Sequence, residues 1–367
     1  MAAILSEDEQ YRAFVTRIKE KIPFEPGNYE YVSARVRAKK AALYPADTYP
    51  RLLQMEIPQI ARFLGEGGYK EEVLALGARL RGVDLIERAT ADNLAKVFTR
   101  IIEISEGRLR IMVAMYLDRW DVANIKTILR AKVYGASAAE VEEDLVAAGS
   151  LDASFLHALL EKETVDEVFK ALEGTIYGEA RRQMGDSFDP AKDRASYEDA
   201  LAHIYYRHLL DSIQPRTEPS RLFNEFVRRE IDILNIKTLL RVWRAKASFA
   251  HDVFLDGGLE LKTDDLREMS ALDLPALVAR LSSYSFYEEI ATALKEIEAK
   301  GVAHVERTLE KFHLKAASRY SHIHPLSVLP VLDFLARKTR EVENIRIIAR
   351  GKEHGIGTDA IKELLVI

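Results

Sequence analysis

Residue types that commonly carry chemistry are scarce in this chain or lack the spacing that chemistry requires. There is no cysteine, which excludes disulfides, thiolate zinc sites and cysteine nucleophiles and is typical of a reducing cytosolic compartment. His313, His322 and His324 lie close together, and a His-x-His pair can bind a metal. No acid or third ligand stands at helical spacing from them, so we favour a loop or capping role for His322 and His324.

Motifs for phosphate binding and for hydrolysis are also missing from the sequence. The run GEGG from Gly65 lacks a preceding strand and the Gly-Lys-Ser/Thr ending that cradles phosphates. The run from Arg350 to Lys352 continues into an acid and a histidine and fails the same test. Neither Gly-x-Ser-x-Gly nor His-Glu-x-x-His occurs. The sequence therefore predicts no catalytic residue, no cofactor and no bound metal.

One group of polar and charged residues does recur with regular spacing. Three stretches, beginning at Asp121, Asp232 and Glu341, share an acid, an asparagine three residues later, an isoleucine directly after it, and cations two and six residues after it. Successive asparagines are 111 and 109 residues apart, which indicates one structural unit used three times. We call this pattern the repeated motif. In order along each copy, its residues are Asp121, Asn124, Ile125, Lys126 and Arg130; Asp232, Asn235, Ile236, Lys237 and Arg241; and Glu341, Asn344, Ile345, Arg346 and Arg350.

On a helix, the motif separates into two faces. At 100° per residue the acid, the asparagine and the isoleucine lie on one apolar face, and the two cations are i and i+4 neighbours on the opposite side. We favour a packing role for the first group, with a buried amide fixing how helices meet; contact with a partner protein is the alternative. The cations are expected to form a solvated face. If three units close around one axis, however, the cations would line it and could bind an acidic or helix-ended partner.

The elements that carry the motif are predicted to be helices. Apolar residues recur at helical spacing in almost every segment, and no run shows sustained period-two alternation. We expect helices over 29–43, after Ile57, from about Asp92 to Gly107, and over 108–132 for the first motif. Pairs of an aliphatic and an aromatic residue, five residues apart, repeat with the same period: Leu64 and Tyr69, Leu172 and Tyr177, Leu281 and Phe286.

These repeats predict an all-α chain of three similar helical bundles. Gly-containing apolar pieces follow the first two motifs and place the seams near residues 149 and 259. The expected units are therefore 1–149, which carries an extra N-terminal helix, 150–259 and 260–367. A length of 367 residues fits two or three domains of ordinary size.

Composition restricts the class of partner. A net charge of −5 argues against nucleic acid, because binding to phosphates needs a basic face. The N-terminal stretch lacks the basic-then-apolar layout of a signal peptide. The longest apolar runs are far shorter than the roughly 20 residues that a membrane-spanning helix needs. We expect a protein that does not cross a membrane but can sit against one that does.

Two stretches carry a resemblance to a known family. The third motif with the residues after it, EVENIRIIARGKEHGI, and the early run YEYVSARVRAKKAALYPADTYPRLL resemble the C subunit of the archaeal and bacterial A/V-type ATP synthases. The eukaryotic counterpart is the d subunit of the vacuolar ATPase. The resemblance covers the whole chain. It implies a funnel of three pseudo-threefold helical domains with an axial cavity, with no catalytic residue and no bound nucleotide.

The same resemblance implies a set of partners. A peripheral protein of this family sits on the cytoplasmic face of the membrane proteolipid (c/K) ring and accepts the central stalk, formed by the D and F subunits, in its cavity. It would turn with the rotor and transmit torque between ATP turnover and proton or sodium transport. Its association with the membrane would be indirect, through the ring. The motif positions carry over only as markers of the fold.

Two other functions fit part of the pattern. A cytosolic all-helical repeat scaffold, unconnected to any membrane machine, would explain the repeats, the acidity and the lack of catalytic motifs. Sedimentation with membranes would distinguish it from a component of such a machine. An enzyme whose three units surround a small-molecule pocket would need convergent groups with shifted pKa values, and the spacing of the residues offers none.

Overall fold

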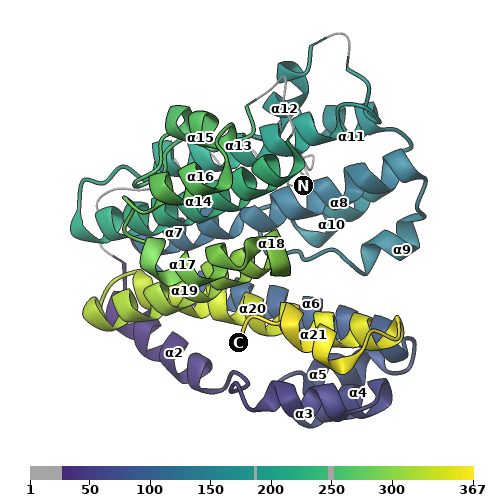
Figure 1. The fold of residues 1–367 in the computed structure, drawn as a ribbon. Helices are drawn as coiled ribbons and strands as arrows, with labels where there is room; N and C mark the ends of the chain where they lie inside the picture. Colours follow the sequence, from purple (N-terminus) through teal and green to yellow (C-terminus); the bar gives the residue numbers. More distant parts are fainter. Residues whose placement is uncertain (1–26, 186–187, 247–251) are drawn as a thin grey trace. The chain divides into compact units, whose positions relative to one another are not determined.

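Helices account for all regular structure in the part of the chain that can be described. The computed structural model describes residues 27–185, 188–246 and 252–367, so the N-terminal stretch examined for a signal peptide lies outside it. Within these ranges no strand occurs, and the predicted all-α class is confirmed (Figure 1). A search of the described helices finds none with the length and apolar character needed to cross a bilayer.

The helices form three series, each with short helices, one long helix and then the helix that carries the motif. The first series is α3 (Thr48–Gln54), α4 (Ile57–Glu66), α5 (Lys70–Leu76), α6 (Gly82–Ile104), α7 (Gly107–Leu117) and α8 (Arg119–Tyr134). The second is α10 (Ala153–Leu160), α11 (Val165–Ala171), α12 (Gly178–Gln183), α13 (Arg194–Ser212) and α14 (Glu218–Ala245). The third is α15 (Thr263–Ser270), α16 (Leu274–Leu281), α17 (Tyr287–Lys295), α18 (Ile297–Lys300), α19 (Val302–Ile323) and α20 (Leu329–Glu353). The remaining helices are α2 (Tyr29–Ala41), α9 (Ala138–Glu142) and α21 (Thr358–Leu364).

The chain divides into two compact units. Unit 1 comprises the described residues up to Tyr205 together with Phe334–Leu365. Unit 2 comprises Tyr206–Asp333 together with Val366–Ile367. The chain thus passes from one unit to the other inside α13 and again inside α20. The three expected units with seams near 149 and 259 stay a prediction.

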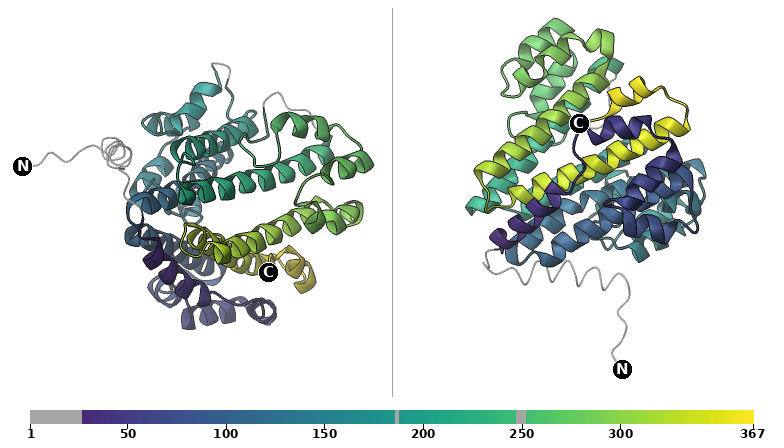
Figure 2. Two further views of the ribbon diagram at one scale, coloured as in Figure 1. Left: turned by 90° about the vertical axis from the view of Figure 1, so that its left-hand side faces the viewer. Right: turned by 90° about the horizontal axis from the view of Figure 1, so that it is seen from below.

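Helix ends follow local chemistry, with two differences from the sequence-based expectations. The break between α4 and α5 falls at the glycines as predicted, and Pro58 stands in the first turn of α4. The predicted start of α6 near Asp92 was wrong, because the apolar stripe that buries Val83 and Ile86 begins a helix ten residues earlier. The single helix expected over 108–132 is two helices, α7 and α8, which meet at Asp118. In the second and third series the motif helix is unbroken (Figure 2).

Motif helices contribute directly to the hydrophobic cores. In unit 2, α14 supplies Ile236 and Leu239, which are fully buried against Leu266 of α15, Ile290 of α17 and Leu309 of α19. Burying an aliphatic side chain of this size contributes about 1.5–3 kcal/mol. In unit 1, α8 packs against α7, α9, α10 and α11, and α3 packs against α21. The motif helices α8 and α14 thus each pack against several other helices.

Candidate functional site

Burial of the repeated motif follows the same pattern in its three copies. The acid, the asparagine and the isoleucine are buried in each copy, the cation two places after the asparagine is half-buried, and the final arginine is exposed. A helix buries such a set only where another segment covers that face. We call the contacts between a motif helix and its covering segment a joint: joint 1 for the motif on α8, joint 2 for that on α14, and joint 3 for that on α20.

At joint 1 the asparagine and the acid both bind backbone groups of the segment that follows α9. Asn124 donates from Nδ2 to the Val146 carbonyl oxygen at 2.7 Å and accepts from the Val146 N–H at 3.0 Å. Asp121 accepts from the N–H groups of Ser150 at 3.0 Å and Leu151 at 3.2 Å. An asparagine side chain has both a donor and an acceptor, so it can satisfy both polar groups of one backbone residue.

Joint 2 repeats this arrangement in unit 2. Asn235 exchanges two hydrogen bonds of 2.8 Å with the backbone of Leu255. Asp232 accepts from the N–H groups of Leu259, Glu260 and Leu261 at 2.9 to 3.1 Å. Burial raises the pKa of Asp232, and the three backbone donors oppose that shift because they stabilise the carboxylate.

Joint 3 is completed by the beginning of the described chain. Glu341 accepts from the Tyr44 N–H at 2.6 Å and from the Tyr69 hydroxyl at 2.7 Å. Lys338, one turn earlier on α20, donates to the same glutamate at 2.9 Å, and its Nζ lies 4.2 Å from the centre of the Tyr69 ring. Asn344 forms a hydrogen bond with the side chain of Tyr49. The third motif thus uses the longer acid, and it adds side-chain partners to one backbone donor where the first two motifs bind mainly backbone groups.

The repeating aromatic residues belong to these joints. The Tyr177 hydroxyl lies 3.4 Å from Asp121 Oδ2 and donates to the Asp118 carbonyl oxygen at 3.1 Å, while the Tyr69 hydroxyl binds Glu341. Phe286 is buried at the corresponding place of joint 2. The recurrence of an aromatic residue in the sequence therefore marks the segment that covers each motif.

The final arginine of each motif binds a glutamate on the long helix of the covering series. Arg130 makes two hydrogen bonds to Glu198 of α13, at 2.7 and 2.5 Å. Arg241 makes two to Glu306 of α19, at 2.5 and 2.8 Å. Arg350 binds both carboxylate oxygens of Glu87 on α6 and also reaches Asp144 at 2.9 Å. The planar guanidinium and the planar carboxylate meet through two parallel hydrogen bonds in each pair.

Sequence reasoning missed these three glutamates. Glu87, Glu198 and Glu306 are separated by 111 and 108 residues, nearly the period of the motif itself. This shared period is the sequence signal that could have identified the three glutamates as partners of the motif. Each one alone looks like an ordinary acid on the solvated face of a helix.

The cations two places after the asparagine also have acidic neighbours within the chain. Lys237 pairs with Glu310 of α19, and Arg346 binds Asp144 at 2.8 Å. Burial lowers the pKa of Lys126, and the nearby carboxylates of Glu198 and Asp199 oppose that shift. The structure therefore brings the six motif cations into the joints, whereas the helical projection alone placed them on a solvated face.

The joints lie inside a region that matches a known family. The sequence profile of the ATP synthase (C/AC39) subunit matches residues 32–364, which include all three motifs and the segments that cover them. The chain belongs to this family. The resemblance stated from the motif and the early helix is thereby confirmed.

Individual relatives are named as the C subunit of the A-type ATP synthase. The chain is 39% identical over 344 residues to that protein of Methanococcoides burtonii, and the match covers 93% of this chain and 94% of the relative. It is 37% identical to that of Haloferax volcanii, with 93% and 98% covered, and 34% identical to that of Archaeoglobus fulgidus, with 92% and 96% covered. The C/AC39 subunit is a non-catalytic part of the rotary ATPase, a motor that couples ATP turnover to ion transport.

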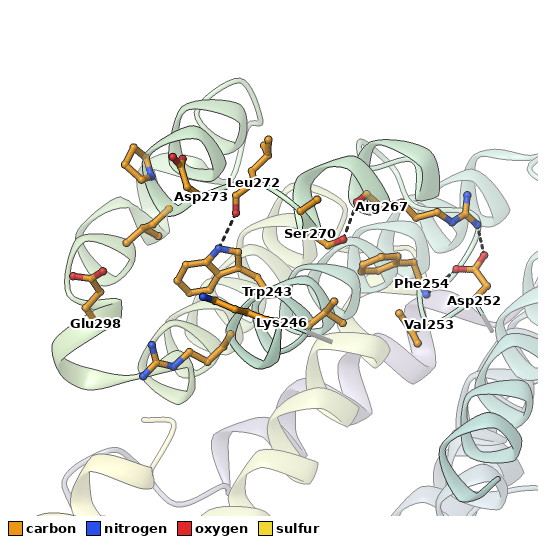
Figure 3. A pocket seen from close by; sticks show the side chains of 15 residues that line it. Trp243, Lys246, Asp252, Val253, Phe254, Arg267, Ser270, Leu272, Asp273 and Glu298 are labelled. Carbon is orange, nitrogen blue, oxygen red and sulfur yellow. Dashed lines mark hydrogen bonds and ion pairs between the residues drawn. The ribbon is translucent and has the colours of Figure 1, made fainter. Parts of the chain in front are cut away.

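The largest other feature of this C/AC39 chain that the described residues form is a pocket without groups placed for a reaction. Unit 2 has a pocket of about 1120 Å³ at the end of α14, where the Trp243 indole N–H donates to the Leu272 carbonyl oxygen at 3.1 Å and Arg267 pairs with Asp252 at 2.5 Å (Figure 3). Neither histidine nor cysteine is among the described residues that line it. Across the described ranges, no three acidic or histidine side chains come together as metal ligands would.

Proposed function

We propose that this protein is the rotor collar of an A/V-type ATP synthase. In this role it links the central stalk, formed by the D and F subunits, to the membrane proteolipid ring and transmits torque between ATP turnover and proton or sodium transport. It is peripheral on the cytoplasmic side, and its association with the membrane is indirect. The family supports a place among the subunits of an ATP synthase; the finer role rests on the joints.

The observation that carries the proposal is the order in which the motifs are covered. The first two motifs are each covered by the segment that follows them, and the third is covered by Tyr44, Tyr69 and Glu87 from the start of the described chain. A stack of repeats normally ends in an uncovered face that needs a cap. Here each of the three motif faces is covered by another segment, as we expect for a funnel of three pseudo-threefold domains around an axial cavity.

Joints of this kind are suited to bearing torsion. Each joint combines a close-packed apolar face with buried hydrogen bonds and an ion pair. Protein interiors packed in this way have low compressibility and transmit strain rather than absorb it. Satisfied buried polar groups also fix one geometry, because any displacement leaves a donor or an acceptor unpaired. A collar that turns with the rotor needs both properties.

The motif cations are also proposed contacts for the stalk. The side chains of Arg130, Arg241 and Arg350 keep 50%, 66% and 49% of their surface exposed although each is ion-paired. A guanidinium has five N–H donors and uses only two or three of them here, so an acidic stalk residue can bind the remaining ones.

The role is tested by removing and restoring the protein in the assembled enzyme. Membranes carrying the complete ATP synthase are compared with membranes stripped of this protein, and both ATP hydrolysis and ATP-driven ion uptake are measured. We expect hydrolysis to continue after removal, ion uptake to fall to background, and uptake to return when the purified protein is added. Ion uptake that persists without the protein would rule out the collar.

The stalk contact has its own test. The purified D and F subunits are pulled down with the native protein and with a variant in which the six motif cations, Lys126, Arg130, Lys237, Arg241, Arg346 and Arg350, are glutamine. We expect a folded variant to lose most of the binding. If the folded variant binds as well as the native protein, the cations serve the joints alone.

A further inference from the structure

Joint 1 contains a second buried acid beside the motif aspartate. Asp118 and Asp121 lie one turn apart at the meeting point of α7 and α8, with 9% and 0% of their surfaces exposed. Both accept a hydrogen bond from the same Ser150 N–H, Asp118 at 3.1 Å and Asp121 at 3.0 Å. Two carboxylates that converge on one donor in a buried place repel each other strongly if both are ionised.

The remaining partners of the pair are neutral donors. Asp118 accepts from the Ser150 hydroxyl at 2.6 Å, and Asp121 accepts from the Leu151 N–H at 3.2 Å and lies 3.4 Å from the Tyr177 hydroxyl. Tyr177 is the titratable group that faces the pair from the covering segment. No lysine, arginine or histidine is among the main influences on either carboxyl in the described part of the chain. The second negative charge of the pair is therefore not compensated.

Joints 2 and 3 have a cation at the sequence position that Asp118 occupies in joint 1. Six residues before the asparagine stand Asp118 in joint 1, Arg229 in joint 2 and Lys338 in joint 3. Lys338 neutralises the acid of its own joint at 2.9 Å from Glu341. Arg229 turns instead to the ring of Tyr320, 5.1 Å away. The pairing of two buried acids thus belongs to joint 1 alone among the three.

We propose that the Asp118–Asp121 pair is a proton-operated latch, in which a bound proton holds joint 1 closed and its loss loosens the segment around Ser150 from α8. The proton lies between two carboxylate oxygens that would otherwise both be anionic. When it leaves, both carboxylates are charged, and the hydrogen bonds that the described residues give them come from neutral donors. Opening the joint exposes the pair to water and relieves the repulsion.

The direction of the pH response follows from where the pair holds its proton. Burial raises the pKa of Asp118 to about 7, and burial together with the charge of Asp118 raises that of Asp121 well above its usual range. In the opened joint both residues titrate near the ordinary value of about 4. Closure therefore binds protons, and its advantage is complete below pH of about 4 and is lost as the pH rises through the raised pKa values of the closed pair.

The test measures local opening at Leu151. Hydrogen exchange at its N–H is followed from pH 5 to 8 in the full-length protein and in Asp118→Asn, whose amide keeps an acceptor for Ser150 and can donate to Asp121. The ratio of the opening constants, native over variant, is expected to rise with pH, by up to tenfold per pH unit, as long as the closed pair holds a proton that the open joint has lost. The control Asp84→Asn, which removes an exposed acid from α6, should follow the native protein.

A second readout detects the proton itself. The native protein at pH 6 should show the infrared C=O band of a protonated, buried carboxylic acid, and that band should be weaker in Asp118→Asn, where only Asp121 is left to hold a proton. If Asp118→Asn does not fold, Ser150→Ala replaces it: loss of the hydroxyl donor should keep the band to a higher pH. Parallel exchange curves, or a native protein without the band, would overturn the latch.

Discussion

At joints 1 and 2 the backbone of the covering segment lies directly against the carboxylate of the motif acid. Asp121 shows how close the fit is, because a Cβ atom added to Gly149 would lie 2.1 Å from its Oδ1. Gly258 stands in the same relation to Asp232, where the corresponding distance is 2.3 Å. Glycine is needed at these two places because the backbone itself approaches the carboxylate.

At the residue scale, Gly149→Ala should displace the Asp121 carboxylate from its backbone donors. Overpacking of this kind costs about 1–3 kcal/mol, and we expect the free energy of unfolding in urea to fall by that amount. Gly68→Ala is the matched control, since no atom lies within 4 Å of the added Cβ. Equal stability of the two variants would show that the carboxylate can move aside at no cost.

For single residues, the sequence predicted which side of each motif helix is buried. It did not predict which residues the buried side chains bind. Helical spacing correctly grouped Asn124 and Asn235 with the apolar face, because periodicity records which side a helix buries. It did not reveal that both bind the backbone of one covering residue. Nor did it reveal Glu198 as the partner of Arg130, because the two are 68 residues apart and an acid on a helix surface is common.

At the element scale, the asparagine and the acid of α8 and of α14 each hold an irregular segment, in addition to the helices that pack against the motif helix. The segment from Val146 to Leu151 has few ladder bonds of its own and is attached to α8 through Asn124 and Asp121. A segment of this kind should detach as one unit, since its backbone groups depend on the same two side chains.

Replacing the asparagine should release the whole segment. In Asn124→Leu the N–H of Val146 stays buried without a partner, at a cost of about 1–3 kcal/mol, while its carbonyl keeps only the Ala148 N–H as a donor. Hydrogen exchange should then quicken at Leu151 as well as at Val146, while the amide of Leu255 in joint 2 is unchanged. Asn235→Leu should produce the reverse pattern. Faster exchange confined to Val146 would mean that the segment does not open as a unit.

At the scale of the whole molecule, the first-series helices and α20 depend on each other across most of the chain. Tyr69 and Glu341 are 272 residues apart, and Arg350 and Glu87 are 263 apart. Lys338 and Glu341 have side chains only 7% and 5% exposed. Burial lowers the pKa of Lys338, and the charge and hydrogen bond of Glu341 oppose that shift.

Breaking the Lys338–Glu341 ion pair should weaken the packing of α20 against the first-series helices. Lys338→Met leaves the buried Glu341 without its cation, and such losses cost about 3–5 kcal/mol. We expect a matching drop in the urea unfolding free energy of unit 1 and faster exchange at the Tyr44 N–H. The double variant Lys338→Met with Glu341→Leu should be less destabilised, because no unpaired charge remains. A single variant as stable as the native protein would contradict a role for the pair in closure.

The sequence by itself determined the all-helical class, the threefold recurrence and membership of the C/AC39 family. These are properties of local periodicity and of residue identity at a fixed spacing, and both can be read along the chain. Only the tertiary structure decided which segment covers each motif, that the third is covered by the start of the described chain, and that Asp118 stands beside Asp121 without a cation. The reason is that a helix face specifies that something must cover it, whereas the partner is chosen by the packing of residues that are tens to hundreds of positions apart.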